Sequence, residues 1–488
     1  MDKANAPLFD KLVSYYQRNS ISFHVPGHKM GEGFSPLGRK VYQEILKIDM
    51  TEIPGLDDLH QPEGVILEAE QRAAKLFGAD HTFFLVNGST TGNLAMILAT
   101  CQPGDKIIVQ RNVHKSVIHG LMLARAVPIY INPKMIPQLG IAGSINKESL
   151  EQTLRTHPDA KGVFIMNPNY YGIGIDLKEI IDLVHSYKIP ILVDEAHGAH
   201  FGLHPSFPSS SLEMGADIVV QSTHKTLFAM TMGSMLHVRS KYIDVDRLKL
   251  YLSMIQTSSP SYPIMASLDL TCHWIEKEGK GLWDNIIQLL DDFYQKVDQL
   301  KIMRVKHRLD RRYFLDPLKI IIHSQNKKVS GVDIQKYLEQ KNIYLELADL
   351  YNALSIVTPG TSYQDLKRLS DGLWEIEQTL INSIDDIQDI ENTEVGSVDH
   401  FIFLNNKQSK ISLEKILYSK TRLVSLQESI GKIAAEMVIP YPPGIPVLQL
   451  GEEITKETIE YLIELKDKGI RFQGIHDHYL QRIKVLDQ

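Results

Sequence analysis

Short apolar runs alternate with amphipathic segments between about residues 80 and 240. The runs are rich in β-branched and aromatic residues and are bounded by Gly, Pro, Asn or Asp, which is typical of buried strands. Segments such as 91–101 and 176–187 carry apolar residues at helical spacing. We expect strands at residues 82–87, 106–110, 127–131, 162–167, 190–196 and 217–222.

This alternation of strands and helices predicts a mostly parallel sheet that is covered by helices on both faces, as in α/β proteins. Ligands of such sheets bind at the carboxyl ends of the strands. Polar residues that directly follow a predicted strand are therefore the first candidates for a functional site.

The pattern changes from about residue 262 onwards. A long amphipathic helix is expected over residues 286–300, and strands are expected at 319–324, 343–347 and 354–358, which together indicate a smaller α+β region. Residues 384–400 are acidic and poor in large apolar residues, as linkers are.

The last segment has its own strand and helix signals and a proline-rich turn, "PYPPGIP", at residues 440–446. We therefore predict an N-terminal arm with a large domain over residues 1–265, a small α+β domain over 266–385, and a C-terminal α+β domain over 396–488.

Composition narrows the class of protein. The chain has 488 residues, 43% of them hydrophobic, and a net charge of -7, which disfavours a partner with a phosphate backbone such as nucleic acid. Two cysteines, Cys101 and Cys272, exclude a disulfide scaffold. The N-terminus lacks the apolar core of a secretory signal, and no apolar run approaches the ~20 residues that span a bilayer. We expect a soluble, cytoplasmic protein without membrane or nucleic-acid partners.

The stretch "VNGSTTGN" (86–93) follows the first predicted strand and opens a helix. Its small and hydroxyl residues are suited to bind a phosphate at the helix N-terminus. The alternative is an ordinary turn in which Ser89 or Thr90 caps the helix.

The stretch "VDEAHGAHF" (193–201) ends the fifth predicted strand. Asp194 follows four apolar residues, so its carboxylate is desolvated and needs a positive partner or hydrogen-bond donors. A structural cap is one alternative. A metal site is another, since Glu195, His197 and His200 lie close by, but the intervening glycine weakens the helical spacing and no third ligand is evident. We expect no metal.

The stretch "QSTHKT" (221–226) places Lys225 at the end of the sixth predicted strand. A lysine buried there has a lowered pKa, and its amine becomes a nucleophile that can form an imine. Ser222 and His224 could bind a phosphate of the same ligand. In "RNVHKS" (111–116), His114 could stack on a flat ring, and the alternative is a core or capping histidine.

These four stretches follow strands of one predicted sheet, in order. A phosphate-binding turn, a neighbour for a flat ring, a carboxylate for a ring nitrogen and an imine-forming lysine are the parts of a pyridoxal phosphate site. The sequence therefore predicts pyridoxal 5'-phosphate as cofactor.

The chain also resembles a known family. "HVPGHK" (24–29), "TSSPSY" (257–262), "YPPGIP" (441–446) and the stretches above are similar to motifs of the bacterial ornithine/lysine/arginine decarboxylases, and the similarity runs from about residue 8 to 480. This family has the aspartate-aminotransferase-like fold, fold type I of pyridoxal phosphate enzymes. Larger members carry an additional N-terminal receiver-like domain, which this chain is expected to lack. Many members have a proline where Phe228 stands here.

The resemblance implies a role for individual residues. Lys225 would form the imine with the cofactor, Asp194 would pair with the pyridinium nitrogen, and His114 would stack on the ring. The remaining contacts are Ser89, Thr90, Ser222 and His224 at the phosphate, Ala196 and His197 at the ring, and Ser258 or Ser259 at the phosphate of a neighbouring subunit's cofactor. The family therefore implies a homodimer, or a higher homo-oligomer, with shared active sites.

The implied reaction is decarboxylation of a basic L-amino acid, which would feed polyamine synthesis. Lys225 or His224 would return a proton to the α-carbon, and a carboxylate would bind the basic end of the substrate. The candidates are Glu346, Asp349 and Glu436, with Glu436 favoured because of the stiff turn that follows it. Arginine is favoured over lysine and ornithine. The alternatives are an aminotransferase or another lyase of the same fold, and a non-catalytic regulator that binds an amino acid or polyamine.

Overall fold

The structure is a computed structural model that describes residues 6–18, 21–326, 328–383, 411–441 and 444–487. The chain divides into two compact units. The first comprises Met1–Cys101 and Leu177–Leu282, and the second comprises Gln102–Asp176 and Trp283–Gln488.

The first unit contains four strands in the order β1, β10, β9, β8. Strands β8 (Ile191–Asp194) and β9 (Ile218–Gln221) are parallel neighbours, and all their residues are buried. Strands β10 (Ser234–Val238) and β1 (His81–Leu85) continue the sheet in antiparallel pairing. Strands β1, β8 and β9 confirm predicted elements.

Strand β10 has no counterpart among the predicted strands. In its sequence, "SMLHV", two fully buried positions are taken by the polar residues Ser234 and His237. The segment therefore lacks the apolar run by which a buried strand is recognised. The polar group of His237 is accommodated because its Nδ1 lies 2.8 Å from the Thr82 hydroxyl of β1. Burial lowers the pKa of His237 to about 3, so the imidazole is neutral.

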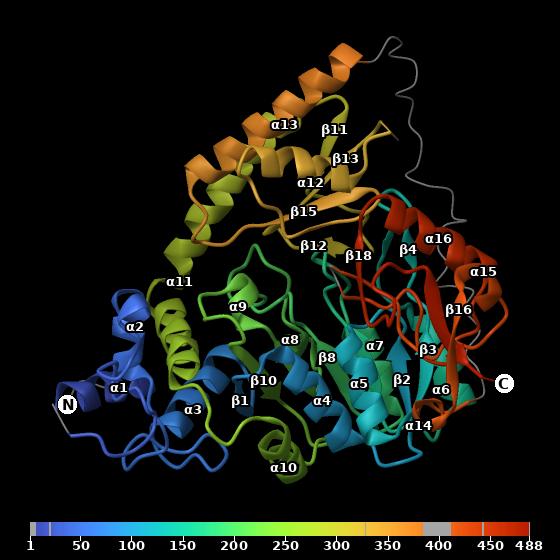
Figure 1. The fold of residues 1–488 in the computed structure, drawn as a ribbon. Coiled ribbons are helices and arrows are strands. Elements are labelled where there is room, and N and C mark those ends of the chain that lie inside the picture. Colours follow the sequence, from blue (N-terminus) through green and yellow to red (C-terminus); the bar gives the residue numbers. More distant parts are fainter. Residues whose placement is uncertain (1–5, 19–20, 327, 384–410, 442–443, 488) are drawn as a thin grey trace. The chain divides into compact units, whose positions relative to one another are not determined.

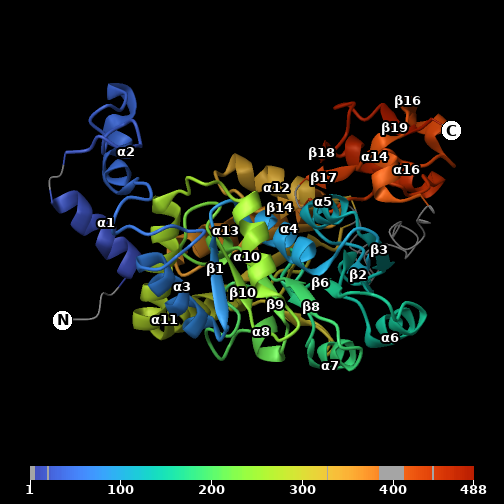
Figure 2. The ribbon, with the colours of Figure 1, turned by 90° about the horizontal axis from the view of Figure 1, so that it is seen from below.

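Helices cover this sheet and build the arm of the first unit. Helix α4 contacts β1, β9, β10 and α10, and α1 packs against α3 (Figure 1). Helix α2 extends beyond α1 and α3 at the edge of the unit (Figure 2). The helices are α1 (Pro7–Gln17), α2 (Pro36–Ile48), α3 (Val65–Phe77), α4 (Gly88–Thr100), α7 (Lys178–Ser186), α8 (Ser211–Met214), α9 (Thr223–Thr226), α10 (Val245–Ile255) and the first part of α11 (Tyr262–Val297).

The second unit begins with three strands of parallel pairing. β2 (Lys106–Gln110) lies between β3 (Val127–Ile131) and β6 (Val163–Met166), which confirms three more predicted strands. Helices α5 (Lys115–Ala124) and α6 (Lys147–Thr156) connect them. Two small pairs complete this part: β4 (Met135–Ile136) with β5 (Ile141–Ala142), and β7 (Ile173–Gly174) with β12 (Phe314–Leu315).

A four-stranded antiparallel sheet follows in the second unit, in the order β11, β13, β15, β14. Its helices α12 and α13 pack against it (Figure 1). The bounds are β11 (Met303–Lys306), β13 (Lys319–Ser324), β15 (Asn352–Ile356), β14 (Leu347–Ala348), α12 (Gly331–Gln340) and α13 (Tyr363–Ser383). The strand predicted over residues 343–347 is wrong for most of its length, since only Leu347 of that run is in a strand.

The C-terminal segment has a core of its own, made of residues such as Val438, Ile459 and Leu462. A buried ion pair joins it to the residue after β2: the Arg111 guanidinium contacts both carboxylate oxygens of Glu452 at 2.7 Å. The elements are α14 (Leu413–Tyr418), β16 (Thr421–Ser425), α15 (Leu426–Ser429), β17 (Ile439–Tyr441), α16 (Lys456–Asp467), β18 (Arg471–Gln473) and β19 (Arg482–Leu486).

The predicted linker, 384–400, lies outside the described residues. Among the residues that are described, no helix is long and apolar enough to cross a membrane. The predicted domain boundaries stay predictions.

Candidate active site

Lys225 lies at the carboxyl end of β9, as the sequence predicts. The chain leaves the strand at Ser222 and turns at once into the short helix α9, which carries Lys225. The side chain is partly buried, whereas the sequence predicts a fully buried lysine. This end of the sheet therefore presents an amine beside the polar residues that follow β8.

The Lys225 amine contacts His197, which follows β8. Its Nζ lies 2.9 Å from Nε2 of His197, whose ring is almost completely buried. Such a contact needs one nitrogen that accepts, so either the imidazole or the amine is without its extra proton. Because β8 and β9 are parallel neighbours, the residues after both strands meet at one edge. The contact holds the amine in one direction.

Asp194, the last residue of β8, is 4% exposed. Its Oδ2 accepts a hydrogen bond of 2.8 Å from the Asn93 side chain, and its Oδ1 accepts one of 3.1 Å from the Ala196 backbone. Burial raises the pKa of Asp194, although these bonds and the charge of Lys225 act in the opposite direction. A carboxylate so desolvated is stabilised in its charged form by a cationic ligand.

Asn93 was not among the predicted site residues. It belongs to α4 and reaches Asp194 because the preceding residue, Gly92, lets the helix approach the sheet closely: a Cβ at Gly92 would lie 2.4 Å from Val220 of β9. The sequence feature that could have identified Asn93 is its amide side chain directly before the apolar run of α4. A buried polar group there calls for a partner.

The turn before α4 has the features of a phosphate-binding turn. The N-cap residue is Asn87, and it makes no side-chain cap hydrogen bond, so the proposal that Ser89 or Thr90 caps the helix is wrong. Ser222 donates a hydrogen bond of 2.8 Å to the Ser89 hydroxyl, which brings two of the predicted phosphate ligands together. Thr90 is exposed in the first turn. Backbone N–H groups of a first turn are suited to bind an anion.

His224 supports the loop that follows Lys225. Its Nδ1 lies 2.9 Å from the Gly233 carbonyl, and its backbone N–H donates to the same oxygen at 3.1 Å. Since a carbonyl only accepts, Nδ1 carries the proton. In this unit Phe228, which stands where many relatives of the motif have proline, packs its ring 4.4 Å from that of Trp274.

The groups that suggested a metal site are separated. Glu195 accepts hydrogen bonds from the Ser211 backbone and hydroxyl and from Gln221, and burial raises its pKa to about 7. The buried His200 ring lies between the rings of Phe201 and Phe207, at 4.9 and 4.8 Å. Over the described ranges, no three His, Cys, Asp or Glu side chains are placed to hold a metal ion.

His114 belongs to the second unit. It caps α5, where its Nδ1 accepts from the Ser116 backbone at 3.3 Å and lies 2.8 Å from the Ser116 hydroxyl. The capping interpretation is thus confirmed. Gly444 lies against the ring, since a Cβ there would be 3.2 Å from Cδ2. Its stacking on a cofactor stays a prediction.

Two of the three predicted substrate-binding acids, also in the second unit, are occupied by the protein itself. Glu436 accepts hydrogen bonds from the His476 and Lys484 backbones at 2.7 and 2.8 Å, one on each oxygen. Both of these bonds brace the C-terminal segment. Both carboxylate oxygens of Glu436 are therefore engaged within the protein, and its role in substrate binding stays a prediction.

Asp349 is held in the same way. It accepts from the Tyr171 hydroxyl and, at 2.6 Å each, from the Tyr351 and Asn352 backbones, and burial raises its pKa. Glu346 differs, because its side chain is exposed and its carboxylate makes no hydrogen bond to the residues that the structure describes.

Ser258 and Ser259 are exposed in the turn between α10 and α11. The Ser259 backbone donates to the Thr257 hydroxyl at 3.2 Å, and the Thr257 carbonyl lies 2.9 Å from Nε2 of His60. These contacts shape the turn and leave its serine hydroxyls directed to the surroundings. Contact with a neighbouring subunit stays a prediction.

The residues of the first unit fit pyridoxal phosphate. The fit rests on three observations: the Lys225 amine after the end of β9, the buried Asp194 carboxylate at the end of the neighbouring strand β8, and the helix start beside Ser89 and Ser222 that has no side-chain cap. An aldehyde, a ring nitrogen that gains a proton and a phosphate are complementary to these three groups.

Comparison with known proteins points the same way. Residues 6–308 match the family described as Orn/Lys/Arg decarboxylase, major domain, and residues 404–481 match its C-terminal domain. The protein YaaO of Bacillus subtilis is 44% identical over 96% of both chains. The arginine decarboxylase of the same organism is 39% identical over 100% of this chain and 99% of its own length.

Solved structures agree in fold. The lysine decarboxylase LdcF of Francisella novicida superposes with a TM-score of 0.84 and 25% identity, covering 99% of this chain and 81% of that one. This likeness confirms the predicted fold class, the aspartate-aminotransferase-like fold with smaller α+β parts.

Proposed function

Because the chain belongs to the Orn/Lys/Arg decarboxylase family, we propose that it removes the α-carboxylate of a basic L-amino acid as CO₂ with the help of pyridoxal phosphate. The observation that carries this proposal is the meeting of Lys225, His197 and Asp194 at one edge of the sheet. An aminotransferase of the same fold remains the competing enzyme, and family membership disfavours it.

Pyridoxal phosphate, when bound, supplies the electron sink that stabilises the carbanion left by loss of CO₂. Asp194 would hold the ring nitrogen in its protonated form, because a buried carboxylate pairs with a cation far better than with a neutral ring. Asn93 and the Ala196 backbone fix the direction of both carboxylate oxygens.

Lys225 would bind the cofactor and afterwards carry a proton. Its contact with His197 allows a proton to pass between the two nitrogens over 2.9 Å, so that the amine can be present in its neutral form. His224 is proposed as a positioning residue, because its Nδ1 is bound to the Gly233 carbonyl and holds the loop after the lysine. We favour Lys225 as the proton donor to the α-carbon.

Arginine is the proposed preferred substrate, since the arginine decarboxylases of Bacillus are similar to this chain over its whole length. The basic end of the substrate needs a carboxylate whose oxygens are available. Of the three candidates Glu346 meets this condition, whereas Asp349 and Glu436 are occupied by protein donors. We therefore transfer the preference from Glu436 to Glu346.

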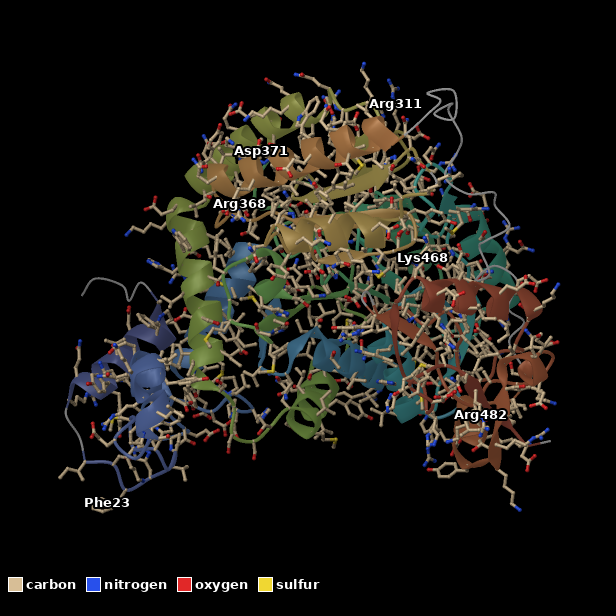
Figure 3. All side chains as sticks on the ribbon, turned by 45° about the horizontal axis from the view of Figure 1, so that its top comes forward. Phe23, Arg311, Arg368, Asp371, Lys468 and Arg482 are labelled. Atoms are coloured by element: carbon tan, nitrogen blue, oxygen red, sulfur yellow. The ribbon has the colours of Figure 1, made fainter. Side chains whose placement is uncertain are left out.

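We also propose a homodimer with shared sites. The arm of the first unit exposes large apolar side chains: Phe23 is 94% exposed, Leu37 96% and Val41 81%. Figure 3 shows Phe23 projecting away from the ribbon. Such surface is unfavourable in water and is typical of a protein interface. The exposed Ser258 and Ser259 would then serve the neighbouring cofactor.

The dimer is tested by mixing two inactive chains. One carries Lys225→Ala and the other carries alanine at both Ser258 and Ser259. In a mixed dimer one site would carry both lesions and the other none, so activity returns. Failure to recover activity, with mixed dimers demonstrated by native mass spectrometry, contradicts shared sites.

The reaction is tested by measuring CO₂ release from arginine, lysine and ornithine and identifying the amine products. Lys225→Ala should abolish release, and Lys241→Ala, a lysine of the same unit on the far side of β10 in sequence, should not. Borohydride should fix the cofactor to Lys225 in peptide maps. Release of ammonia or transfer of the amino group without CO₂ would overturn the proposal.

We place the enzyme in the cytoplasm, where its amines would feed polyamine synthesis.

A further inference from the structure

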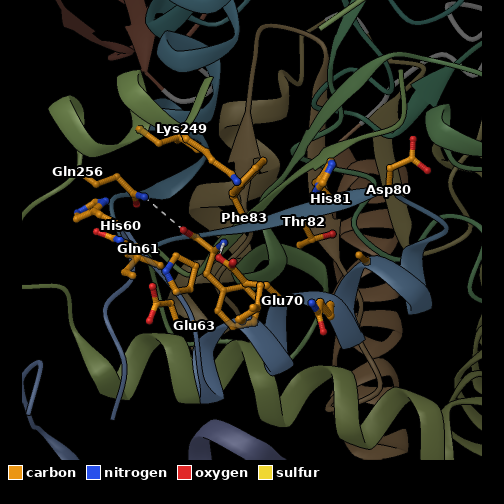
Figure 4. Close-up of a pocket in the computed structure, with 17 residues that line it drawn as sticks. His60, Gln61, Glu63, Glu70, Asp80, His81, Thr82, Phe83, Lys249 and Gln256 are labelled. Atoms are coloured by element: carbon orange, nitrogen blue, oxygen red, sulfur yellow. Dashed lines mark hydrogen bonds between the residues drawn. The ribbon is translucent and has the colours of Figure 1, made fainter. Parts of the chain in front are cut away.

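A cavity of about 490 Å³ lies in the first unit, between the start of α3, strand β1 and helix α10. Its volume falls in the range of ligand pockets, roughly 300–1,000 Å³. Figure 4 shows His60, Gln61 and Glu63 near one end of β1 and Asp80 with His81 at the other, while Lys249 comes from α10 and Gln256 directly follows that helix. None of the predicted active-site residues lines it.

Glu70 is the buried polar group of this cavity. It is 5% exposed, and one carboxyl oxygen accepts a hydrogen bond of 2.8 Å from the Phe84 backbone of β1. The second oxygen has no hydrogen-bond partner among the described residues, although the carboxyl group lines the cavity. Burial raises the pKa of Glu70 to about 8, and Asp57 and Lys249 act on it with opposite signs.

A structural role explains only one of the two carboxyl oxygens of Glu70. β1 is an edge strand, and its free backbone groups are satisfied by side chains: Glu70 accepts from Phe84, while Gln256 accepts from Val86 and donates to the Phe84 carbonyl. A glutamine at position 70 would supply the same acceptor without burying an ionisable group. The unused oxygen therefore calls for another partner.

The wall opposite β1 is preformed. The loop over residues 57–64 is held by the Asp57 carboxylate, which accepts from the backbones of Glu63, Gly64 and Ile66 at 2.8–2.9 Å. The Tyr262 hydroxyl donates to the Asp57 carbonyl at 2.7 Å. A loop fixed in this way can present its lining residues to a small molecule without further ordering.

The charges around the cavity favour a cation. Three carboxyl groups line it, Glu63, Glu70 and Asp80, against one lysine, Lys249, and two histidines. Apolar side chains lie between the ends, among them Leu67, Phe83 and Leu252. A linear aliphatic chain with an ammonium group at each end matches this order of acidic, apolar and acidic surface.

We propose that this cavity binds a linear aliphatic diamine, with one ammonium group on Glu70. The inference stands on the cavity and is independent of the proposed reaction. A bound ammonium stabilises the ionised form of Glu70, which is mostly protonated at pH 7, so binding releases a proton. The affinity therefore rises with pH up to about 8. The other charged or ionisable side chains that line the cavity are Glu63, Asp80, Lys249, His60 and His81.

The test is calorimetric titration of the cofactor-loaded enzyme with 1,4-diaminobutane. Glu70→Gln keeps the acceptor for Phe84 and removes the charge, and Glu68→Gln on the exposed face of α3 is the matched control. Both variants retain the active site, so any amine bound there is unchanged. We expect Glu70→Gln to weaken one binding event at least about tenfold, and the control to bind like the wild type.

Two further readouts secure the result. Titrations at pH 7 in buffers of different ionisation enthalpy should show about one proton released per diamine in the wild type and none in Glu70→Gln. Glu63→Gln, at the exposed rim, should weaken binding less, and it serves if Glu70→Gln does not fold. Each of three results would overturn the proposal: equal affinities of the wild type and all variants for the diamine, binding of 1,4-butanediol as tight as that of the diamine, or no binding beyond the active site.

Discussion

Replacement of Asp194 by asparagine removes the negative charge of the side chain and nearly keeps its shape, so it tests the role of the charge. Two donors face the group, the Asn93 amide on Oδ2 and the Ala196 backbone on Oδ1. A carboxylate accepts from both, whereas an amide has one accepting oxygen and an NH₂ group. Asp194→Asn therefore leaves one buried donor without an acceptor, which costs about 1–3 kcal/mol.

The second loss is the charged contact with the cofactor. A hydrogen bond to a charged group contributes about 1.5–3 kcal/mol, which is roughly tenfold to 150-fold in kcat/KM at ~1.4 kcal/mol per factor of ten. Part of the lost stability is offset, because burial disfavours the charged form of Asp194, raising its pKa, and a neutral amide is easier to bury. The fold should therefore persist while activity falls.

The assay is kcat/KM for CO₂ release with saturating pyridoxal phosphate, together with the cofactor Kd from visible absorbance. Asp182→Asn, on the exposed surface of α7 in the same unit, is the matched control and should behave as wild type. If Asp194→Asn retains activity within twofold of the wild type, the carboxylate is merely structural and its assignment to the ring nitrogen is wrong.

The remaining predictions concern single charges. The pKa of Glu70 is about 8 in the folded protein and 4.5 when unperturbed, so the free energy of unfolding falls as pH rises from about 4.5 through 8. Glu70→Gln should therefore raise the urea midpoint relative to wild type more at pH 9 than at pH 5, by up to ~5 kcal/mol in free energy. An equal shift at both pH values would contradict this. Glu452→Gln removes the carboxylate charge that pairs with the buried Arg111 guanidinium and should destabilise the fold by about 3–5 kcal/mol in thermal or urea melts; a change below about 1 kcal/mol would show that the pair is dispensable. Glu346→Gln should raise the KM for arginine several-fold to a hundredfold with the cofactor still bound, and an unchanged KM refutes its role. Chelators should leave activity unaltered; inactivation would restore the metal interpretation.

The order of the site along the chain follows from the sequence alone. Apolar runs that are buried on both faces must form strands, and the polar residues directly after them must lie at the sheet edge. Asp194 is thereby predicted at the end of β8 and Lys225 just after β9, and the structure has both residues there. Strand β10 was not predicted, because two of its five residues, Ser234 and His237, are polar, and the partners of His237, Thr82 of β1 and Gln221 of β9, lie far away in the sequence.

Other features depend on partners that local sequence cannot reveal. Asn93 reaches Asp194 only because Gly92 admits the helix to the sheet, and Glu436 is taken by backbone N–H groups 40 and 48 residues away. Whether a carboxylate is occupied by the protein, as that of Glu436 is, or makes no hydrogen bond to the described residues, as that of Glu346, is decided by such distant donors. The sequence by itself determined the residue types and their order along the strands, because both follow from local burial. Tertiary structure alone decided which polar atoms remain available, since hydrogen bonds between distant segments form only when the chain has folded.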